Sequence, residues 1–323
     1  MTAAAPRFCV VTPSFNTRRY IGACIDSVLA QQGVPVDHIV MDGGSTDGTV
    51  DLLRSYGDRL KWVSQKDDGQ SDAIRRGWGQ VGTGAGDEVL AWLNSDDTYA
   101  PGAFAHVAEV FARNPHCDIV YGGATYIDAR DKHISYCTHI ERYSAHRLLY
   151  YSDFIVQPTT FFRRRALEAV GGINVALNWV MDYELWVRFA QAGYKFAFTP
   201  RVLAHFRWLS ENKTATGGMP RIDEIDRTLG ALGLPTPAYV QLERCALLAK
   251  TGLIAAATGH LGQAASDIGR GLTYLARTPR AVWSLFDPFT WHVIWTGQVL
   301  RARAAAADRR WKAQAAKSRA RRA

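Results

Sequence analysis

The chain has 323 residues, of which 47% are hydrophobic, 11% aromatic and 21% charged. This composition excludes disordered and fibrous proteins, and the length allows a large buried core. The formal net charge is +8, but residues 270–323 hold twelve basic and two acidic residues, so this stretch carries +10 and the other 269 residues carry −2. Because only the end of the chain is basic, the charge does not indicate a nucleic-acid-binding protein.

The first hundred residues alternate between two hydrophobic periods. Four short apolar runs predict buried strands at residues 8–12, 38–41, 61–64 and 89–93. Apolar residues at helical spacing predict helices at residues 20–29, 50–53 and 71–81, with Ser45 or Thr46 as a cap for the second. This alternation predicts an α/β fold with a mostly parallel sheet, whose ligands bind outside the carboxyl ends of the strands.

The remaining elements predict a second, helical region. After residue 101 the pattern indicates a helix at 103–113, a hairpin turning at 128–131, a strand at 161–162 and a helix at 182–191. From Arg221 onward the chain is rich in alanine and predicts a helical hairpin, residues 239–258 and 261–276. We therefore expect three regions: an α/β domain at 1–220, a helical hairpin extension at 221–280, and an aromatic, basic, amphipathic tail at 281–323.

Five cysteines are dispersed along the chain and form no C-x-x-C pair: Cys9, Cys24, Cys117, Cys137 and Cys245. Their odd number and spacing argue against a disulfide framework or a zinc site and favour a reducing compartment. Residues 1–7 lack the features of a signal peptide, and no uncharged apolar stretch reaches the roughly 18–20 residues of a spanning helix. These features predict a cytoplasmic protein.

Aspartates follow three of the predicted strands at the same edge of the sheet: Asp42, then Asp67 and Asp68, then Asp96 and Asp97. Adjacent carboxylates repel each other unless a cation or a hydrogen-bond network compensates. Mg²⁺ and Mn²⁺ prefer oxygen ligands and often bind through one or two carboxylates and substrate phosphates. The alternative is that Asp96 and Asp97 cap the helix that follows. The two neighbouring acidic clusters favour a cation site.

Five sequence blocks occur in the order and spacing of a known enzyme family. They read VTPSFN at 11–16, MDGGSTDGT at 41–49, LNSDD at 93–97, QPTTFFR at 157–163 and DYELWVR at 182–188. Together they span roughly residues 7–210 and resemble family 2 glycosyltransferases. More narrowly, the chain is similar to the bacterial subgroup that builds O-antigen and capsule polysaccharides.

The resemblance implies a GT-A fold, a Rossmann-like sheet with flanking helices, here followed by a C-terminal helical extension. It implies an inverting enzyme that depends on Mn²⁺ or Mg²⁺. Such an enzyme moves a sugar from a nucleoside-diphosphate donor to a glycan or a polyprenyl-linked acceptor in cell-surface polysaccharide biosynthesis. No nucleic-acid partner is expected.

The resemblance also assigns donor and metal contacts by position in the blocks. Asp42 would accept the base-ring N–H of the nucleotide, Asp96 would face the ribose, and Asp97 would bind the metal. Asp67 would lie beside the base or ribose. The nucleotide wall would be shaped by Pro13, Ser14 and Asn16.

Three cationic or imidazole side chains are candidate contacts for the diphosphate or the metal. Arg75 stands where the subgroup usually has Asn-Lys before a glycine, and it either binds the diphosphate bidentately or is a surface cation. His205 follows the last predicted strand and either approaches the metal or diphosphate or is structural. Arg207 is a comparable candidate for a phosphate contact.

Asp182, at the start of the helix at 182–191, is the expected catalytic base. Inverting transfer requires deprotonation of the acceptor hydroxyl, which a general base accelerates by about 10²–10⁴. Relatives carry the base at this position, often after another acid that Met181 replaces here. The alternative for Asp182 is favourable interaction with the helix N-terminus, about 0.3–1 kcal/mol. Glu184 is the substitute candidate for the base and points to a different helix face.

The aromatic and basic tail predicts attachment to a membrane surface. Its uncharged stretch, residues 288–300, is too short to span a bilayer. Tryptophans beside Arg and Lys are typical of a helix lying in the interface of an anionic membrane. We therefore expect peripheral association with the inner face of the cell membrane. The alternative is that the aromatics pack on the catalytic domain.

Two other functions would share some of these sequence features. A sugar-nucleotide nucleotidyltransferase also combines aspartates with Mg²⁺ on an α/β sheet, but it favours a glycine-rich loop with a lysine near the first strand. Residues 12–20 contain neither glycine nor lysine. A nucleic-acid-binding protein that uses the basic tail is disfavoured, because the chain has no aromatic RNA-binding motif and no zinc pattern.

Overall fold

The computed structural model describes residues 5–209 and 212–277. These residues divide into two compact units. The first comprises the chain up to Tyr143 together with Phe154–Trp208, and the second comprises Ser144–Asp153 together with the described residues from Leu209 onward. The expected boundary after residue 220 falls inside a helix, Gly218–Ala231. The expected tail at 281–323 lies outside the described residues.

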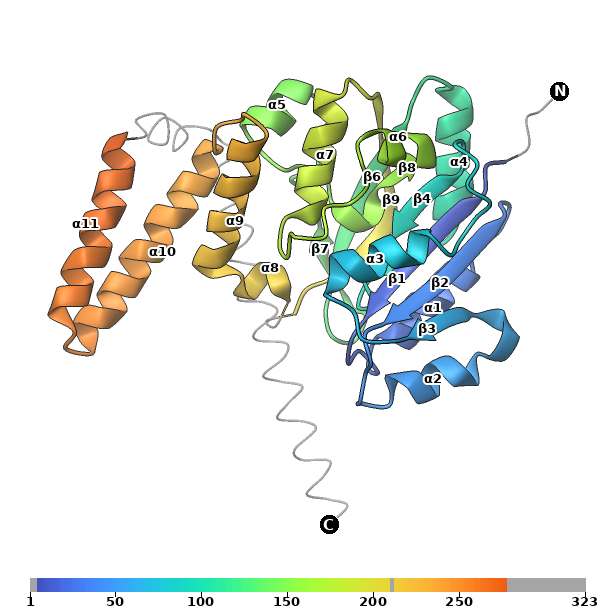
Figure 1. The fold of residues 1–323 in the computed structure, drawn as a ribbon, viewed down its shortest axis with the longest axis horizontal. Coiled ribbons are helices and arrows are strands. Elements are labelled where there is room, and N and C mark those ends of the chain that lie inside the picture. The colour runs from blue at the N-terminus through green and yellow to red at the C-terminus, as the bar shows by residue number, and fades with distance from the viewer. Residues whose placement is uncertain (1–4, 210–211, 278–323) are drawn as a thin grey trace, which may run out of the picture. The chain divides into compact units, whose positions relative to one another are not determined.

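The first unit is built on a nine-stranded sheet in the order β3-β2-β1-β4-β8-β6-β9-β5, with β7 paired to β6 (Figure 1). The strands are β1 (Phe8–Ser14), β2 (Val36–Asp42), β3 (Lys61–Ser64), β4 (Val89–Trp92), β5 (Thr98–Tyr99), β6 (Ile119–Ile127), β7 (His133–Tyr136), β8 (Phe161–Arg163) and β9 (Phe196–Arg207). Strands β1 to β4 are parallel, and β9 is parallel to β6. β8 is antiparallel to both β4 and β6, and β5 is antiparallel to β9. The predicted mostly parallel α/β sheet is confirmed.

Helices cover both faces of this sheet. They are α1 (Ile21–Leu29), α2 (Thr49–Ser55), α3 (Gln70–Trp78), α4 (Ala103–Arg113), α6 (Arg164–Ala169) and α7 (Met181–Gln191). Alternate side chains of β1 point to opposite faces. Phe8 and Val10 belong to one core with α1 and α4, whereas Val11 faces α3. A Cβ atom added at Gly77 would lie 2.5 Å from Val11 Cγ1, so glycine there allows α3 to pack directly on β1.

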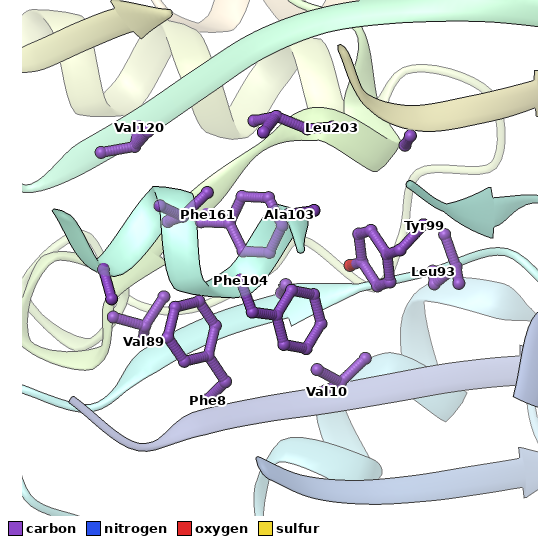
Figure 2. Close-up of a cluster of buried hydrophobic side chains, with 14 of the residues drawn as sticks. Phe8, Val10, Val89, Leu93, Tyr99, Ala103, Phe104, Val120, Phe161 and Leu203 are labelled. Carbon is purple, nitrogen blue, oxygen red and sulfur yellow. The ribbon is translucent and has the colours of Figure 1, made fainter. Parts of the chain in front are cut away.

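Aromatic side chains form the core on both faces. On the α4 face the rings of Phe8 and Phe104 stack at 4.9 Å, and Phe161 meets both edge-on (Figure 2). On the α3 face Trp92 of β4 stacks on Trp186 of α7, with ring centroids 5.6 Å apart. This second contact anchors α7 to the strand that precedes the Asp96–Asp97 loop, so it fixes the N-terminus of α7 relative to that loop.

The start of α2 differs from the sequence prediction. Ser45 and Thr46 do not cap the helix, because Gly48 is the N-cap residue, with φ 88° in the left-handed region that favours glycine. The side chain of Asp47 accepts a hydrogen bond from the Thr49 N–H at 3.0 Å. The Ser45 hydroxyl is instead used at the end of β2, where it contributes to the candidate site described below.

His38 on β2 is buried, and its Nε2 lies 3.0 Å from the Thr12 hydroxyl. Burial lowers the pKa of His38 from its ordinary 6.5 to about 4, while the charge of Asp37 acts in the opposite direction. The unfolded chain protonates His38 near pH 6.5, whereas the folded chain does so only near pH 4. His38 therefore does not lower the free energy of unfolding above pH 6.5, but lowers it increasingly as the pH falls toward 4. We expect a loss of roughly 3 kcal/mol over this interval from His38. Urea unfolding across this pH range measures the loss. His38→Gln should reduce the dependence of the free energy of unfolding on pH, and an equal dependence in the two chains would contradict the prediction.

The second unit is helical. Its elements are α5 (Ala145–Tyr150), α8 (Lys213–Thr216), α9 (Gly218–Ala231), α10 (Ala238–Ala257) and α11 (Leu261–Arg277). α10 and α11 form the predicted hairpin. The buried Arg244 of α10 joins all three long helices, because its guanidinium pairs with Asp226 of α9 and lies 4.8 Å from the ring centroid of Tyr274 of α11. None of the described helices is both long and apolar enough to cross a membrane.

Candidate active site

The carboxyl ends of β1, β2 and β3 lie side by side because these parallel strands are in register. Ser14 is opposite Asp42, and Asp42 is opposite Ser64. β4 runs parallel on the other side of β1, so the loop with Asp96 and Asp97 leaves the sheet at the same edge. The prediction that these acidic clusters share one edge is confirmed.

Asp42 is held by several donors at the end of β2. Its side chain is only 2% exposed. Oδ2 accepts hydrogen bonds from the N–H groups of Gly44 and Ser45, at 3.1 and 2.9 Å, and from the Ser64 hydroxyl at 2.7 Å. Oδ1 accepts from the hydroxyls of Ser45 and Ser14. An incoming base N–H would therefore share Asp42 with hydroxyl groups that can rotate to other partners.

Asn16 ties the loop after β1 to the loop after β2. Its φ is 54°, in the left-handed region that asparagine tolerates. The Asn16 N–H donates to the Ser45 hydroxyl at 2.7 Å, and its Oδ1 accepts the Thr46 N–H at 2.9 Å. Pro13 lies within β1 and is buried, whereas the ring of Phe15 is 63% exposed at this edge. The expected nucleotide wall is thus a connected structure with one exposed aromatic ring.

A pocket of about 280 Å³ is lined by residues from the ends of β2 and β3 and from α3 and the turn after it. It brings together three residues that the sequence assigned to donor binding, Asp42, Asp67 and Arg75. The complete lining is Met41, Asp42, Val63, Gln65, Asp67, Ala73, Arg75, Arg76, Gly79 and Gln80. Both acidic and basic groups line this pocket, so it offers acceptors and donors to a polar ligand.

The arginines of this pocket share a carboxylate partner. Asp72, on the first turn of α3, accepts from Nη2 of Arg75 and from Nη2 of Arg76, each at 2.6 Å. Burial acts to raise the pKa of Asp72, but the hydrogen bond from Arg75, the Asp68 N–H and the charge of Arg76 outweigh it and lower the pKa. The Arg75 side chain is 56% exposed, so it combines a surface position with one fixed partner.

Asp97 is the most deeply buried carboxylate of the edge, with 1% of the residue exposed. Oδ1 accepts the backbone N–H of Arg207 at 2.8 Å. Oδ2 is buried and has no hydrogen-bond partner among the described residues. Burial, followed by the charge of Asp96, raises the pKa of Asp97 well above its ordinary value, and burial also raises the pKa of Asp96. A buried carboxylate oxygen left without a donor fits a hard cation.

The structure does not gather a full set of protein ligands around that oxygen. Within the described residues, no group of three or more His, Cys, Asp and Glu side chains is arranged to hold a metal. His205 lies in the β9 register position opposite Thr98, and its Nδ1 is 2.7 Å from the Thr125 hydroxyl. Burial and then the charge of His133 lower the pKa of His205. A site with one protein carboxylate fits Mg²⁺ or Mn²⁺ that completes its coordination with substrate phosphates and water.

Arg207 has different partners from those expected of a phosphate contact. The residue is 1% exposed at the end of β9. Its Nε donates to the carbonyl of Asp96 at 2.7 Å, and its Nη1 donates to the carbonyl of Asp128 at 2.6 Å. The guanidinium therefore connects the Asp96–Asp97 loop to the turn between β6 and β7.

Asp182 lies in the first turn of α7, as predicted, and is neither fully buried nor fully exposed. Its Oδ1 accepts the Tyr183 N–H at 2.8 Å. Glu184, the substitute candidate for the base, is 5% exposed and is paired with Arg188 through two hydrogen bonds of 2.7 Å. Arg188 also donates to the carbonyls of two residues before α7. Glu184 would therefore have to give up this ion pair in order to accept a proton.

The start of α3 connects Asp182's helix with the Asp96–Asp97 loop. Gln70 donates to Oδ1 of Asn94 at 2.6 Å, and the Ser71 hydroxyl donates to the carbonyl of Leu177 at 2.9 Å, just before α7. Sequence reasoning missed Gln70 and Ser64 as members of this edge. Ser64 is the last residue of β3 and Gln70 is the first residue of the helix that follows, and these positions were the available signal, since ligands bind where parallel strands end.

Comparison with protein families and curated proteins gives a consistent result. The model of the family described as Glycosyl transferase family 2 matches residues 9–171. The chain is 25% identical over 233 residues to an uncharacterized glycosyltransferase of Rickettsia typhi, which covers 69% of this chain and 70% of that protein. It is 28% identical over 190 residues to a PGL/p-HBAD biosynthesis glycosyltransferase of Mycobacterium tuberculosis, covering 57% and 70%. The match spans 59% of a Rickettsia prowazekii glycosyltransferase and 35% of a Rickettsia felis one.

Solved structures share the fold. The mannosyltransferase PcManGT from Pyrobaculum calidifontis, in complex with GDP-Man and Mn²⁺, has a TM-score of 0.56 at 18% identity, over 96% of this chain and 88% of that one. S. aureus TarS 1-349, in complex with UDP-GlcNAc, has a TM-score of 0.51 at 13% identity, over 81% and 90%. The predicted GT-A fold with additional C-terminal helices is confirmed.

Proposed function

The chain belongs to glycosyl transferase family 2 and is a glycosyltransferase, and on this premise we propose the substrates and the site of its reaction. The proposed donor is a nucleoside-diphosphate sugar, bound with Mn²⁺ or Mg²⁺ at the carboxyl edge of β1, β2 and β4. The proposed reaction inverts the configuration at the anomeric carbon of the sugar, because an acceptor hydroxyl attacks that carbon from the side opposite the leaving diphosphate. GDP-Man with Mn²⁺ in PcManGT and UDP-GlcNAc in TarS support a donor of this class.

One observation carries the proposal: the buried, unpartnered Oδ2 of Asp97 stands at the same sheet edge as a polar pocket that contains Asp42, Asp67 and Arg75. A nucleotide sugar has a polar base and ribose at one end and an anionic diphosphate at the other. The pocket offers hydrogen-bonding groups suited to the first, and Asp97 offers a ligand for the cation that accompanies the second.

Each residue of the edge then has a definite task. Asp42 accepts the base-ring N–H of the nucleotide, Asp67 lies beside the base or ribose, and Asp96 faces the ribose. The first strand's end supplies the nucleotide wall, made of Pro13, Ser14 and Asn16. Arg75, whose side chain is 56% exposed, is available to an anionic group at the mouth of the pocket.

Asp97 would hold the cation through Oδ2, and His205 is a further candidate ligand or phosphate contact. A divalent cation bound there would neutralise charge on the departing diphosphate. Asp182, at the N-terminus of α7, would accept the proton of the acceptor hydroxyl. Two features set the position of Asp182. Trp92 of β4 stacks on Trp186 of α7. The start of α3 donates hydrogen bonds both to Asn94, in the loop that holds Asp97, and to Leu177, just before α7.

The proposed acceptor is a glycan or a polyprenyl-linked glycan in cell-surface polysaccharide biosynthesis, reached at the inner face of the cell membrane. The residues assigned to membrane attachment, 281–323, hold four tryptophans among nine arginines and lysines. Trp and cationic side chains together favour the interface of an anionic bilayer. Flotation with anionic liposomes tests this attachment, and equal flotation of a chain that lacks residues 281–323 would contradict it.

The donor assignment is tested with a panel of nucleoside-diphosphate sugars and Mn²⁺, Mg²⁺ or EDTA. A donor present at about 100 times its Kd should add roughly 2.7 kcal/mol of stability. That corresponds to a rise in melting temperature of about 5–10 °C for a chain of this size. The rise should require the divalent cation. If no donor stabilises the chain or is consumed, the proposed donor class is wrong.

A further inference from the structure

We propose that Arg207 is a positioning residue, one that holds the Asp96–Asp97 loop in its cation-binding conformation and does not touch the donor. This inference rests on the proposed function, since it concerns the cation site. It replaces the expectation that Arg207 contacts a phosphate. Three sets of contacts carry it.

The first set joins Arg207 to both aspartates through the backbone. The Arg207 N–H donates to Oδ1 of Asp97 at 2.8 Å, and its Nε donates to the main-chain carbonyl of Asp96 at 2.7 Å. The first bond selects which oxygen of Asp97 is occupied, and the second fixes the backbone that carries it. Oδ2 is thereby left buried and without a partner among the described residues.

The second set joins the guanidinium to the turn between β6 and β7. Nη1 donates to the carbonyl of Asp128 at 2.6 Å, and Nη2 pairs with the carboxylate of Asp131. Asp131 has a φ of 63°, which Asp adopts more readily than most residues, so the turn presents this carboxylate in a defined way. All three nitrogens of the guanidinium thus donate to protein acceptors.

The third contact covers a face of the Arg207 guanidinium with an aromatic ring. The guanidinium carbon of Arg207 lies 4.8 Å from the ring centroid of Tyr20, which precedes α1. Arg207 is therefore enclosed by three segments and is 1% exposed. A donor phosphate would have to displace these partners to reach it. Lysine could keep the charge but not the planar fork that reaches the loop and the turn together.

The test measures Mn²⁺ binding by the full chain without any nucleotide. The electron paramagnetic resonance signal of free Mn²⁺ reports how much of the ion stays unbound. Arg207→Lys should weaken Mn²⁺ binding by about 10-fold or more, as loss of an outer contact to a metal ligand does elsewhere. Asp131→Asn should weaken it in the same direction by a smaller factor, because the fork loses one charged partner. Asp131→Asn also keeps Arg207 itself, so the prediction survives if Arg207→Lys does not fold.

Arg164→Lys is the matched control. Arg164 is 7% exposed and pairs with Glu88 through Nε at 2.8 Å, beside the start of β4 and away from the carboxyl edge. It should lower the melting temperature without changing Mn²⁺ affinity. UDP and GDP binding in EDTA should be the same for Arg207→Lys and the parent chain.

The outcomes separate this inference from the proposed function. If Arg207→Lys binds Mn²⁺ like the parent but loses UDP or GDP binding in EDTA, Arg207 is a phosphate contact and the inference is overturned. If Arg164→Lys weakens Mn²⁺ binding as much as Arg207→Lys, the effect is general destabilisation and the inference is again overturned. If the parent and Asp97→Asn bind Mn²⁺ equally, it is the cation site of the proposed function that fails.

Discussion

Asp97→Asn is expected to abolish the cation-dependent response to a donor while stabilising the chain without ligand. The substitution removes a buried charge that stands next to Asp96 and whose Oδ2 has no partner within the described residues. Asn keeps an oxygen that can accept the Arg207 N–H, now 2.8 Å from Oδ1. We therefore expect a higher free energy of unfolding, because a neutral amide is not repelled by Asp96 and cannot become a buried charge.

The loss of activity has a separate cause. An amide oxygen is a weaker ligand for a hard cation than a carboxylate, so the charge on the departing diphosphate would be less neutralised. A loss of several kcal/mol of transition-state stabilisation corresponds to roughly a 10³-fold drop in turnover. Donor-dependent thermal shifts with and without Mn²⁺, and turnover of the best donor, measure both effects.

Asp118→Asn is the control for this prediction. Asp118 is 9% exposed, and its Oδ1 accepts two hydrogen bonds from Arg165, at 2.8 and 3.1 Å, just before β6. Its replacement should cost stability and leave the donor response unchanged. A destabilised Asp97→Asn chain that still responds to donor and Mn²⁺ would show that Asp97 is structural. Functional sites commonly keep a charged group that lowers the stability of the fold, because the reaction needs it.

The sheet and its acidic edge were predictable because they depend on local patterns. Short apolar runs that end in Pro, Gly or Asp reveal β1, β2 and β4, and parallel order then places Asp42 and Asp97 at one edge. The sequence blocks added the roles. Position in the chain was sufficient here because Asp42 is the last residue of β2 and Asp97 lies in the loop after β4.

The partners of the site residues were not predictable, because they come from distant segments. Arg207 meets Asp97 and Asp131 across separations of 110 and 76 residues, and no local pattern indicates that its guanidinium is buried. Ser45 looked like a helix cap, but its hydroxyl accepts the Asn16 N–H from 29 residues away, and Gly48 takes the cap position. The sequence pattern predicts which residues lie at the carboxyl edge of the sheet. Tertiary packing determines which of their atoms can still bind a ligand.

Asp182→Asn is expected to lower turnover by about 10²–10⁴, or roughly 3–5 kcal/mol of barrier, with donor and Mn²⁺ binding unchanged. Asn cannot accept the acceptor's proton, but it keeps the size of the side chain and an oxygen for the Tyr183 N–H, now 2.8 Å from Oδ1. Steady-state transfer and donor thermal shifts measure the two quantities separately.

Glu184→Gln distinguishes the base from its neighbour on α7. Glu184 holds Arg188 in a two-bond ion pair and is 5% exposed, so its neutralisation should lower the melting temperature. It should leave turnover per folded molecule unchanged, because its oxygens are already occupied by Arg188. If Glu184→Gln stops transfer while Asp182→Asn does not, the proton goes to Glu184, and Arg188 must then release it during the reaction. We propose Asp182 over Glu184 because both oxygens of Glu184 already accept from Arg188.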